Sequence, residues 1–236
     1  MGTSRTARRG AATLAALALL TGCVPTLADD GGDGDATRVG AGQLDEEQLS
    51  GVLPRVEQQP PGFSVDPDSG NGADQSDPEA TAYPASCLDL RLAGAAGTDL
   101  ETHEQAAVKR EFVGDDGGFL SVSVTSHDTA VPDELFDDAG AAQGACGTFQ
   151  LIDSQGPTSW KLSPVTFPQM GDRSYSTRVE STTEGDIFEG GVIHLAASSV
   201  GNNLVYVVYS SGPPSEYDPT AVESFTRATV DNLTAL

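Results

Sequence analysis

Alternating apolar and polar residues in the middle of the chain predict a β-hairpin. The first arm alternates at Ala106, Val108, Arg110 and Phe112, and the second places Leu120, Val122 and Val124 between Ser121, Ser123 and Thr125. This period of two is typical of strands with one buried face. Residues 114–118, with the sequence Gly-Asp-Asp-Gly-Gly, lie between the arms. Because glycine and aspartate favour tight turns, the two arms should pair directly.

Helical spacing predicts three helices elsewhere. Apolar residues recur at i, i+3, i+4 and i+7 from Leu49, which indicates a short helix ending near Pro54. A second helix is expected over residues 132–145, with proline and two acidic residues in its first turn. A third begins at Asp218, an N-cap residue followed by Pro219, and continues towards the C-terminus.

The remaining pattern favours strands joined by short turns. Four further strands are expected near residues 160–162, 175–179, 192–197 and 204–209. Consecutive strands of this kind imply an antiparallel meander. We therefore predict a single α+β domain over residues 43–236, whose antiparallel meander sheet has about five to six strands, with helices packed mainly on one face. Residues 64–82 read as a polar loop, and residues 87–92 fit either a short strand or a helix end.

The first 22 residues have the composition of a secretory signal peptide. Three arginines precede an apolar run over residues 11–20, and the segment contains no acidic residue. The run is too short to span a bilayer, which needs about 20 residues. It is followed by Leu-Thr-Gly-Cys, which resembles the bacterial lipobox and predicts cleavage before a diacylglyceryl-modified Cys23. The alternative is an ordinary signal peptide cleaved near Ala28.

The net charge of the chain limits the kinds of molecule that it can bind. The chain has 12 Lys and Arg against 35 Asp and Glu, a formal net charge of −23. Loss of the leader removes three arginines and lowers the net charge to −26. Such a chain repels phosphate backbones, so nucleic acid is excluded as a partner. Residues 23–42 are rich in Asp and Gly and read as the lipidated N-terminus and a flexible tether.

Cysteine usage agrees with export. Apart from Cys23, the chain contains Cys87 and Cys146, a single pair that an oxidising compartment would join. The pair closes a loop of 59 residues, and for a loop of this length the chain-entropy model predicts that the disulfide stabilises the fold by roughly 4 kcal/mol. A metal site would need more ligands than this pair, and a catalytic thiol would leave the other cysteine unexplained.

The motifs of common enzymes are missing. The sequence has no nucleophile elbow, phosphate-binding loop, zinc-protease helix or CxxC pair, so we expect no enzymatic activity, no cofactor and no metal. His103 precedes Glu104 as at the start of a strand, and His127 is expected in an exposed loop with a local hydrogen bond to Asp128.

Three residues remain as candidate ligand contacts: Tyr175, His194 and Tyr206. His194 shares a strand face with Val192 and Ala196, where a neutral, hydrogen-bonded core histidine is the simpler interpretation. If helices cover one face of the sheet, a tyrosine on the other could line a shallow groove, although tyrosines in sheets more often pack at the rim than form a binding platform.

Several features together resemble small actinobacterial envelope lipoproteins of unknown function and the extracellular sensor domain of PknH-type receptor kinases. They are the lipobox, the tether, Leu53-Pro54 leading to Pro60-Pro61-Gly62-Phe63, the two cysteines flanking a hairpin and a helix, Met170-Gly171-Asp172-Arg173-Ser174 before a strand, and the C-terminal helix. The sensor domain typically carries two disulfides, whereas this chain has cysteines for one. The resemblance implies a non-catalytic module that binds something at the outer face of the membrane.

These observations predict a lipoprotein anchored on the extracytoplasmic face of the cell membrane, with a ligand-binding or sensor-like domain. Its partners would be the membrane, through the lipid on Cys23, and a small-molecule, envelope or protein ligand. Two alternatives stay open. One is a lipid or glycolipid carrier, which would enclose a long apolar cavity, and the other is a secreted hydrolase in which His127 or His194 meets a carboxylate and a nucleophile.

Overall fold

The structure is a computed structural model that describes residues 39–67, 80–154, 156–163, 165–185, 189–213 and 217–236. The predicted signal peptide, Cys23 and most of the tether lie outside these residues. None of the described helices is both long enough and apolar enough to cross a membrane.

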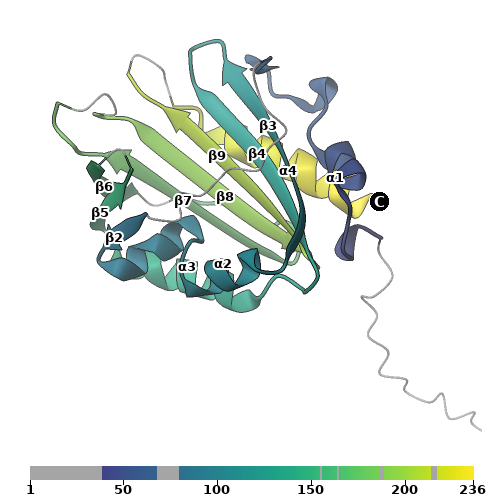
Figure 1. Ribbon diagram of the computed structural model, residues 1–236. Coiled ribbons are helices and arrows are strands. Elements are labelled where there is room, and N and C mark those ends of the chain that lie inside the picture. The colour runs from purple at the N-terminus through teal and green to yellow at the C-terminus, as the bar shows by residue number, and fades with distance from the viewer. Residues whose placement is uncertain (1–38, 68–79, 155, 164, 186–188, 214–216) are drawn as a thin grey trace, which may run out of the picture. The chain divides into compact units, whose positions relative to one another are not determined.

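The described residues form one antiparallel sheet of nine strands (Figure 1). The strands are β1 (Phe63–Val65), β2 (Thr81–Tyr83), β3 (Glu104–Gly114), β4 (Phe119–His127), β5 (Thr148–Asp153), β6 (Gly156–Ser163), β7 (Arg173–Ser181), β8 (Val192–Val200) and β9 (Asn203–Ser211). Their order across the sheet is β1-β3-β4-β9-β8-β7-β6-β5-β2. The predicted α+β class and the β3–β4 hairpin are therefore confirmed.

Two details of the predicted sheet are wrong. The described sheet has nine strands where five to six were expected. The strands β1 and β2 lie at the two ends of the segment that was predicted to be a polar loop, and β5 was not predicted. Each edge strand has three residues, too few to show a period, and each is held by backbone pairing to a longer neighbour. The sheet is also more than a meander: β5 to β9 follow one another, and β9 then pairs with β4 of the earlier hairpin.

Three of the four described helices, α1, α3 and α4, form where the sequence pattern placed them, whereas α2 was not predicted. They are α1 (Glu46–Val52), α2 (Ala95–Glu101), α3 (Asp133–Ala145) and α4 (Pro219–Thr234), with 3-10 turns η1 (Val39–Ala41), η2 (Val56–Gln58) and η3 (Ala85–Arg91). The Asp45 carboxylate accepts from the Gln48 backbone N–H, and Asp218 does the same for Thr220. Residues 87–92, left open between strand and helix, belong largely to η3.

Helices lie on both faces of the sheet, which corrects the expectation of one covered face (Figure 1). On the first, the α4 face, Phe225 and Leu49 of the helices pack with Phe112 and Val207 of the strands. On the second, the α3 face, helices α2 and α3 and the segment η3 pack beside β7 and β8. The reason is visible in β9, whose residues 204–209 are apolar or aromatic on both faces. Such a strand needs cover on both sides.

The first described residues are fixed to the turn between β8 and β9. The side-chain amide of Asn203 donates to the carbonyl oxygens of Gly40 and Gly42, at 3.0 and 2.8 Å. The backbone N–H of Asn202 donates to the carbonyl of Ala41 at 2.9 Å. Asn203 is fully buried, so the start of the domain is part of its core.

Candidate functional site

The three candidate residues separate into two groups. On the α3 face, register pairs Tyr206 with Ala197 and Ala197 with Tyr175, so the two tyrosines lie in one row across β9, β8 and β7. His194 shares the α4 face with Ala196 and is opposite Tyr209 and Arg178. The structure thus brings the two tyrosines together and places His194 on the other side of the sheet.

Both tyrosine hydroxyls bind the backbone of η3. Tyr175 donates to the carbonyl oxygen of Leu90 at 3.2 Å, and Tyr206 donates to that of Arg91 at 3.3 Å. Burial raises the pKa of the Tyr175 hydroxyl, so it remains a neutral donor. Tyr175 is only 6% exposed, which makes it a positioning residue for η3, whereas Tyr206 is partly exposed.

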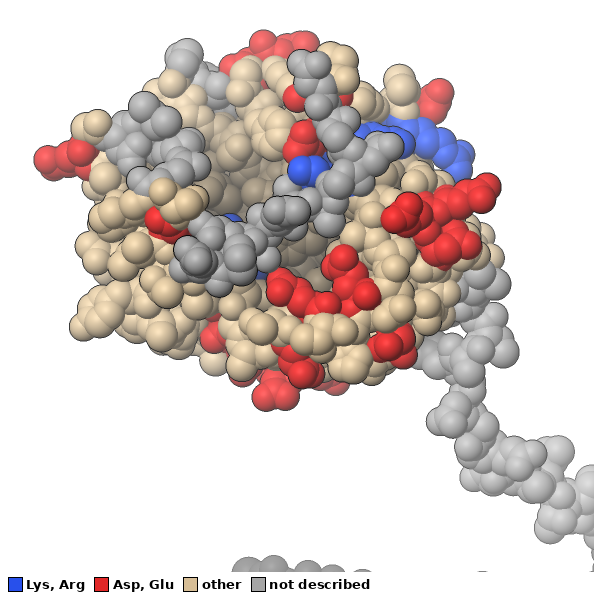
Figure 2. Space-filling model, viewed as in Figure 1, with Lys and Arg blue, Asp and Glu red and all other residues tan. Residues whose placement is uncertain are grey.

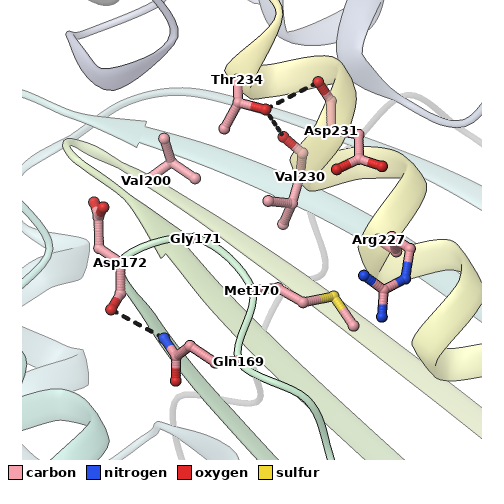
Figure 3. A pocket seen from close by; sticks show the side chains of 9 residues that line it. All are labelled: Gln169, Met170, Gly171, Asp172, Val200, Arg227, Val230, Asp231 and Thr234. Atoms are coloured by element: carbon pink, nitrogen blue, oxygen red, sulfur yellow. Dashed lines mark hydrogen bonds between the residues drawn. The ribbon is translucent and has the colours of Figure 1, made fainter.

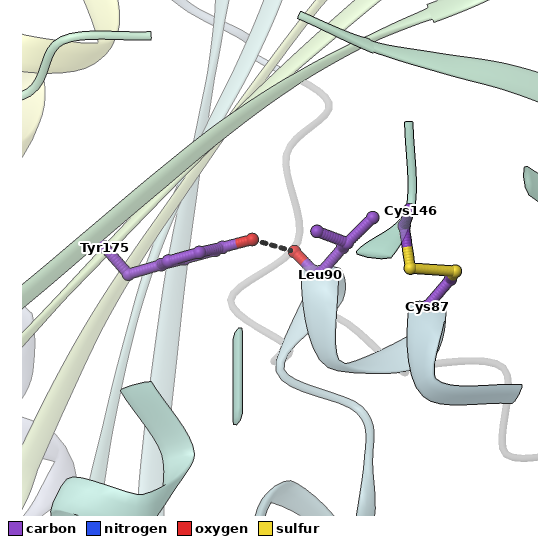
Figure 4. Close-up of a disulfide and its surroundings, with 4 residues drawn as sticks. All are labelled: Cys87, Leu90, Cys146 and Tyr175. Carbon is purple, nitrogen blue, oxygen red and sulfur yellow. Dashed lines mark hydrogen bonds between the residues drawn. A yellow bond between two sulfur atoms is a disulfide. The ribbon is translucent and has the colours of Figure 1, made fainter. Parts of the chain in front are cut away.

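The disulfide joins the same element to α3 (Figure 4). Cys87 lies in η3, Cys146 caps α3, and their Cα atoms are 5.8 Å apart. Figure 4 shows Tyr175 reaching η3 from the sheet while the disulfide reaches it from α3. The covalent bond and the hydrogen bond together fix η3 as one wall of the α3 face.

Beyond this wall, small polar residues form the surface of the sheet. Lys109 pairs across the strands with Ser123, and Ser123 with Tyr206; in the next row Glu111 pairs with Ser121. We call these five residues the serine floor. Serine side chains are short, so they leave depth between the larger groups on either side. Figure 2, viewed from this side, shows the face hollowed near its centre, with acidic side chains along its rim.

The serine floor carries its own ion pair. Lys109 Nζ lies 2.8 Å from Glu111 Oε1, and the two side chains are 15% and 18% exposed. Shielding from water strengthens such a pair relative to one on an open surface. Ser121 and Ser123 are only 4% and 6% exposed, and the Ser123 hydroxyl donates to the Tyr206 carbonyl oxygen at 3.3 Å. The groups of the floor that a polar ligand would meet are therefore mainly the Lys109–Glu111 pair and the partly exposed Tyr206. The sequence identified Ser121 and Ser123 only as polar positions of an alternating strand, and it gave no signal that they would contribute to a site.

His194 is a core residue within a chain of hydrogen bonds. Its Nδ1 is 2.7 Å from the Tyr217 hydroxyl and its Nε2 is 2.8 Å from Ser176 Oγ. Ser176 donates its own proton to the carbonyl of Leu195 at 3.0 Å, so it accepts from Nε2–H, and Tyr217 donates to Nδ1. Burial, and then the nearby Arg178 guanidinium, lowers the pKa of His194 to about 4.

This hydrogen-bond direction is wrong for a nucleophilic serine. A general base must accept the hydroxyl proton, but His194 donates to Ser176. Both residues are also buried, at 1% and 7% exposure. The arrangement stabilises the sheet and gives no support to the hydrolase alternative.

The other two histidines lie together at the end of the β3–β4 hairpin. His127 is the last residue of β4 and is 2% exposed, so the expected exposed loop position is wrong. Its Nδ1 is 3.2 Å from the carbonyl of Leu100 and its Nε2 is 2.9 Å from Thr125 Oγ1. His103 takes the predicted contact with Asp128, at 2.8 Å. No group of metal-binding side chains occurs within the part of the chain that the structure describes.

A cavity of about 360 Å³ lies beside the C-terminal half of α4 (Figure 3). Its lining residues are Gln169, Met170, Gly171, Asp172, Val200, Arg227, Val230, Asp231 and Thr234. The polar groups there are largely bonded to one another or to near neighbours: Gln169 donates to the Asp172 carbonyl and Arg227 donates to Glu223. A second cavity, of about 480 Å³, lies at the start of α1 among Gln43, Asp45, Glu46 and Gln105.

The fold and site define a class: an α+β domain whose antiparallel sheet has helices on both faces and a hollowed polar surface between them. The chain is similar to the extracellular domain of PknH from Mycobacterium tuberculosis, with a TM-score of 0.55 and 14% identity over 83% of this chain and 100% of that one. A putative uncharacterized protein from Mycobacterium smegmatis aligns with a TM-score of 0.43 and 15% identity, covering 81% and 98%. No protein-family model and no curated protein matches the sequence. The predicted resemblance to the PknH sensor domain is confirmed at the level of the fold.

Proposed function

We propose that this chain is an extracytoplasmic lipoprotein whose domain binds a polar ligand on the serine floor and does not catalyse a reaction. The single observation that carries the proposal is the serine floor itself. Ser123 lies between Lys109 and Tyr206, and Ser121 lies between Glu111 and Val208, on the sheet face that Figure 2 shows hollowed. Concave surfaces with a few placed polar groups are the usual form of ligand sites.

Three observations support the location. The N-terminal pattern reads as a signal peptide ending at a lipobox cysteine, and the later cysteines form a disulfide, which is characteristic of oxidising compartments. The fold is similar to an extracellular domain. Two or three acyl chains on one cysteine give stable membrane attachment where a single chain does not.

A lipid-carrier function receives less support. Such a carrier needs a long apolar cavity, whereas the two cavities described above are lined by glutamine, aspartate and arginine beside their apolar residues. The apolar residues on both faces of the sheet are packed into core clusters instead.

The proposed binding of a ligand can be tested by placing a large side chain on the serine floor. Native mass spectrometry of the full chain, purified in mild detergent from its own membranes, should show a bound polar small molecule. Ser123→Phe should remove that mass, because a phenyl ring occupies the hollow. Ser50→Phe, the same change at an exposed position of α1, should retain it. A bound mass that survives Ser123→Phe in a folded protein, or a bound lipid in its place, contradicts the proposal.

Anchoring can be tested separately through Cys23. Metabolic labelling with an alkyne fatty acid should mark the full chain, and Cys23→Ala should abolish the label and release the protein from the membrane fraction. Continued membrane attachment of Cys23→Ala, with unchanged electrophoretic mobility, would overturn the lipoprotein assignment while leaving the ligand test intact.

A further inference from the structure

The cavity beside the C-terminal half of α4 has no part in the proposed function. It lies between residues 169–172, which precede β7, and the last two turns of α4 (Figure 3). Its inner wall is formed by Met170, Val200 and Val230, which are 5%, 4% and 5% exposed and belong to the core on the α4 face. The cavity is therefore on the opposite face of the sheet from the serine floor, and its volume of about 360 Å³ is sufficient for a small molecule.

The wall before β7 is a fixed loop. Gly171 has φ +65°, and an added Cβ would lie 2.3 Å from the carbonyl oxygen of Ser199, so this position requires glycine. The backbone N–H of Asp172 donates to the same carbonyl at 2.8 Å, and that of Met170 donates to Ser174 Oγ at 2.7 Å. Because this wall is held by the protein itself, the cavity is formed before a ligand enters, which lowers the cost of binding.

The charged groups of the cavity leave one carboxylate without a partner. Arg227 donates to Glu223 Oε1 at 2.8 Å, in the favourable order of an acidic residue four positions before a basic one. The guanidinium is thus balanced by a carboxylate outside the cavity lining. Asp172 Oδ2 accepts from the backbone N–H of Gly201 at 2.7 Å. The carboxylate of Asp231 has no hydrogen bond or ion pair among the described residues.

The end of α4 adds to this negative potential. The last turn of a helix carries a partial negative charge and favours cations, and α4 has no basic residue in its last turn. Asp231 and Thr234 of this turn both line the cavity. A positively charged group in the cavity would therefore meet the unpaired carboxylate and the negative end of the helix together.

We propose that this cavity binds a small organic cation, a primary ammonium group on a short alkyl chain. The ammonium group pairs with Asp231 beside the end of α4, and the alkyl chain contacts Met170, Val200 and Val230. The side chains of this inner wall carry no oxygen or nitrogen atom, so they favour an alkyl group over a bare metal ion. An anion is repelled by the net charge of −23 and would meet only a guanidinium that Glu223 already holds.

The test is calorimetric titration of the full chain in mild detergent with pentylamine hydrochloride, with 1-pentanol and ammonium chloride as the two halves of the ligand. Pentylamine should bind more tightly than either half. We expect Asp231→Asn to weaken its binding roughly 5-fold, the effect of losing one solvated ion pair. Asp99→Asn, the same change at an exposed position of α2, should alter the affinity less than about 2-fold. Arg227→Gln should retain or tighten binding, because it removes a cation from the cavity.

The proposal is overturned by the absence of pentylamine binding, by equal binding of 1-pentanol or of ammonium chloride, or by an equal effect of Asp99→Asn and Asp231→Asn. Loss of binding in Arg227→Gln would show that the ligand is held as an anion. Loss of binding in Ser123→Phe would place the amine on the serine floor, so the two sites are tested independently. The three charged residues are exposed, and circular dichroism of each variant establishes that the fold is retained.

Discussion

Tyr175 on β7 donates a hydrogen bond from its buried hydroxyl to the backbone carbonyl oxygen of Leu90 in η3. Because η3 also contains Cys87, this one contact joins the sheet to the element that the disulfide joins to α3 (Figure 4). The wall of the α3 face is therefore held from two sides, once by a hydrogen bond and once covalently.

Removing the Tyr175 hydroxyl should lower stability measurably. Tyr175→Phe leaves the carbonyl of Leu90 without this donor in a buried place, and we expect a loss of about 1–2 kcal/mol in the free energy of unfolding by urea. Tyr206→Phe removes the same group from a more exposed bond to Arg91 and should cost less than about 0.5 kcal/mol. Equal losses in the two variants would contradict the role of burial.

Breaking the disulfide should have a larger effect. Cys87→Ala opens a loop with a sequence separation of 59 residues, and we expect a loss of roughly 4 kcal/mol in urea unfolding. The double variant with Cys146→Ala should be no worse than the single one, because the first change already removes the bond. Reaction of both cysteines with a thiol reagent in the unfolded, non-reduced protein would show that the bond is absent in solution.

His194 should make stability depend on pH. Its pKa falls from 6.5 to about 4 on folding, so the folded state disfavours the charged ring. The contribution is fully present above pH 6.5 and is lost as pH falls from 6.5 towards 4, by about 3 kcal/mol in total. His194→Gln should therefore flatten the fall in unfolding free energy over this range.

The comparison of wild type with His194→Gln separates this histidine from the many carboxyl groups, which titrate in both proteins. Burial also lowers the pKa of His127, so a smaller dependence of the same sign should remain in the variant. Parallel curves for the two proteins between pH 6.5 and 4 would show that His194 does not titrate as proposed.

Two glycines should respond to alanine in opposite directions. Gly201 has φ +58°, and an added Cβ would lie 2.0 Å from the carbonyl oxygen of Ala41, so Gly201→Ala should destabilise the domain by several kcal/mol. Gly140 lies on the exposed side of α3 with nothing within 4 Å of an added Cβ. Gly140→Ala should raise stability by about 0.5–1 kcal/mol. Thermal and urea unfolding of both variants provide the measurement.

The sequence predicted long or well-capped elements better than short ones. The alternation before and after residues 114–118 and the N-cap at Asp218 are local signals, and both correspond to elements of the structure. β1 and β2 form because a longer strand offers them backbone partners, and three residues carry no period of their own. This accounts for two of the three missed strands; the third, β5, has six residues with alternating burial and was not assigned.

The site could be predicted only in part. Tyr175 and Tyr206 were identified as residues of interest, but their hydroxyls bind η3, a segment more than 80 residues away in sequence. His127 is buried where its ring meets the carbonyl oxygen of Leu100, and the larger side chains beside Ser121 and Ser123 come from β3 and β9. These are contacts between distant segments, which a one-dimensional pattern does not contain.

The attachment of residues 40–42 to Asn202 and Asn203 has a mechanical consequence. A force applied to residues 40–42 enters the domain at the turn between β8 and β9, two central strands, and not at an edge. An edge strand peels away one backbone bond at a time, whereas here the pull is shared by Asn203 and the two ladders beside it. Tension at residues 40–42 would therefore load the central strands of the sheet before the outer ones.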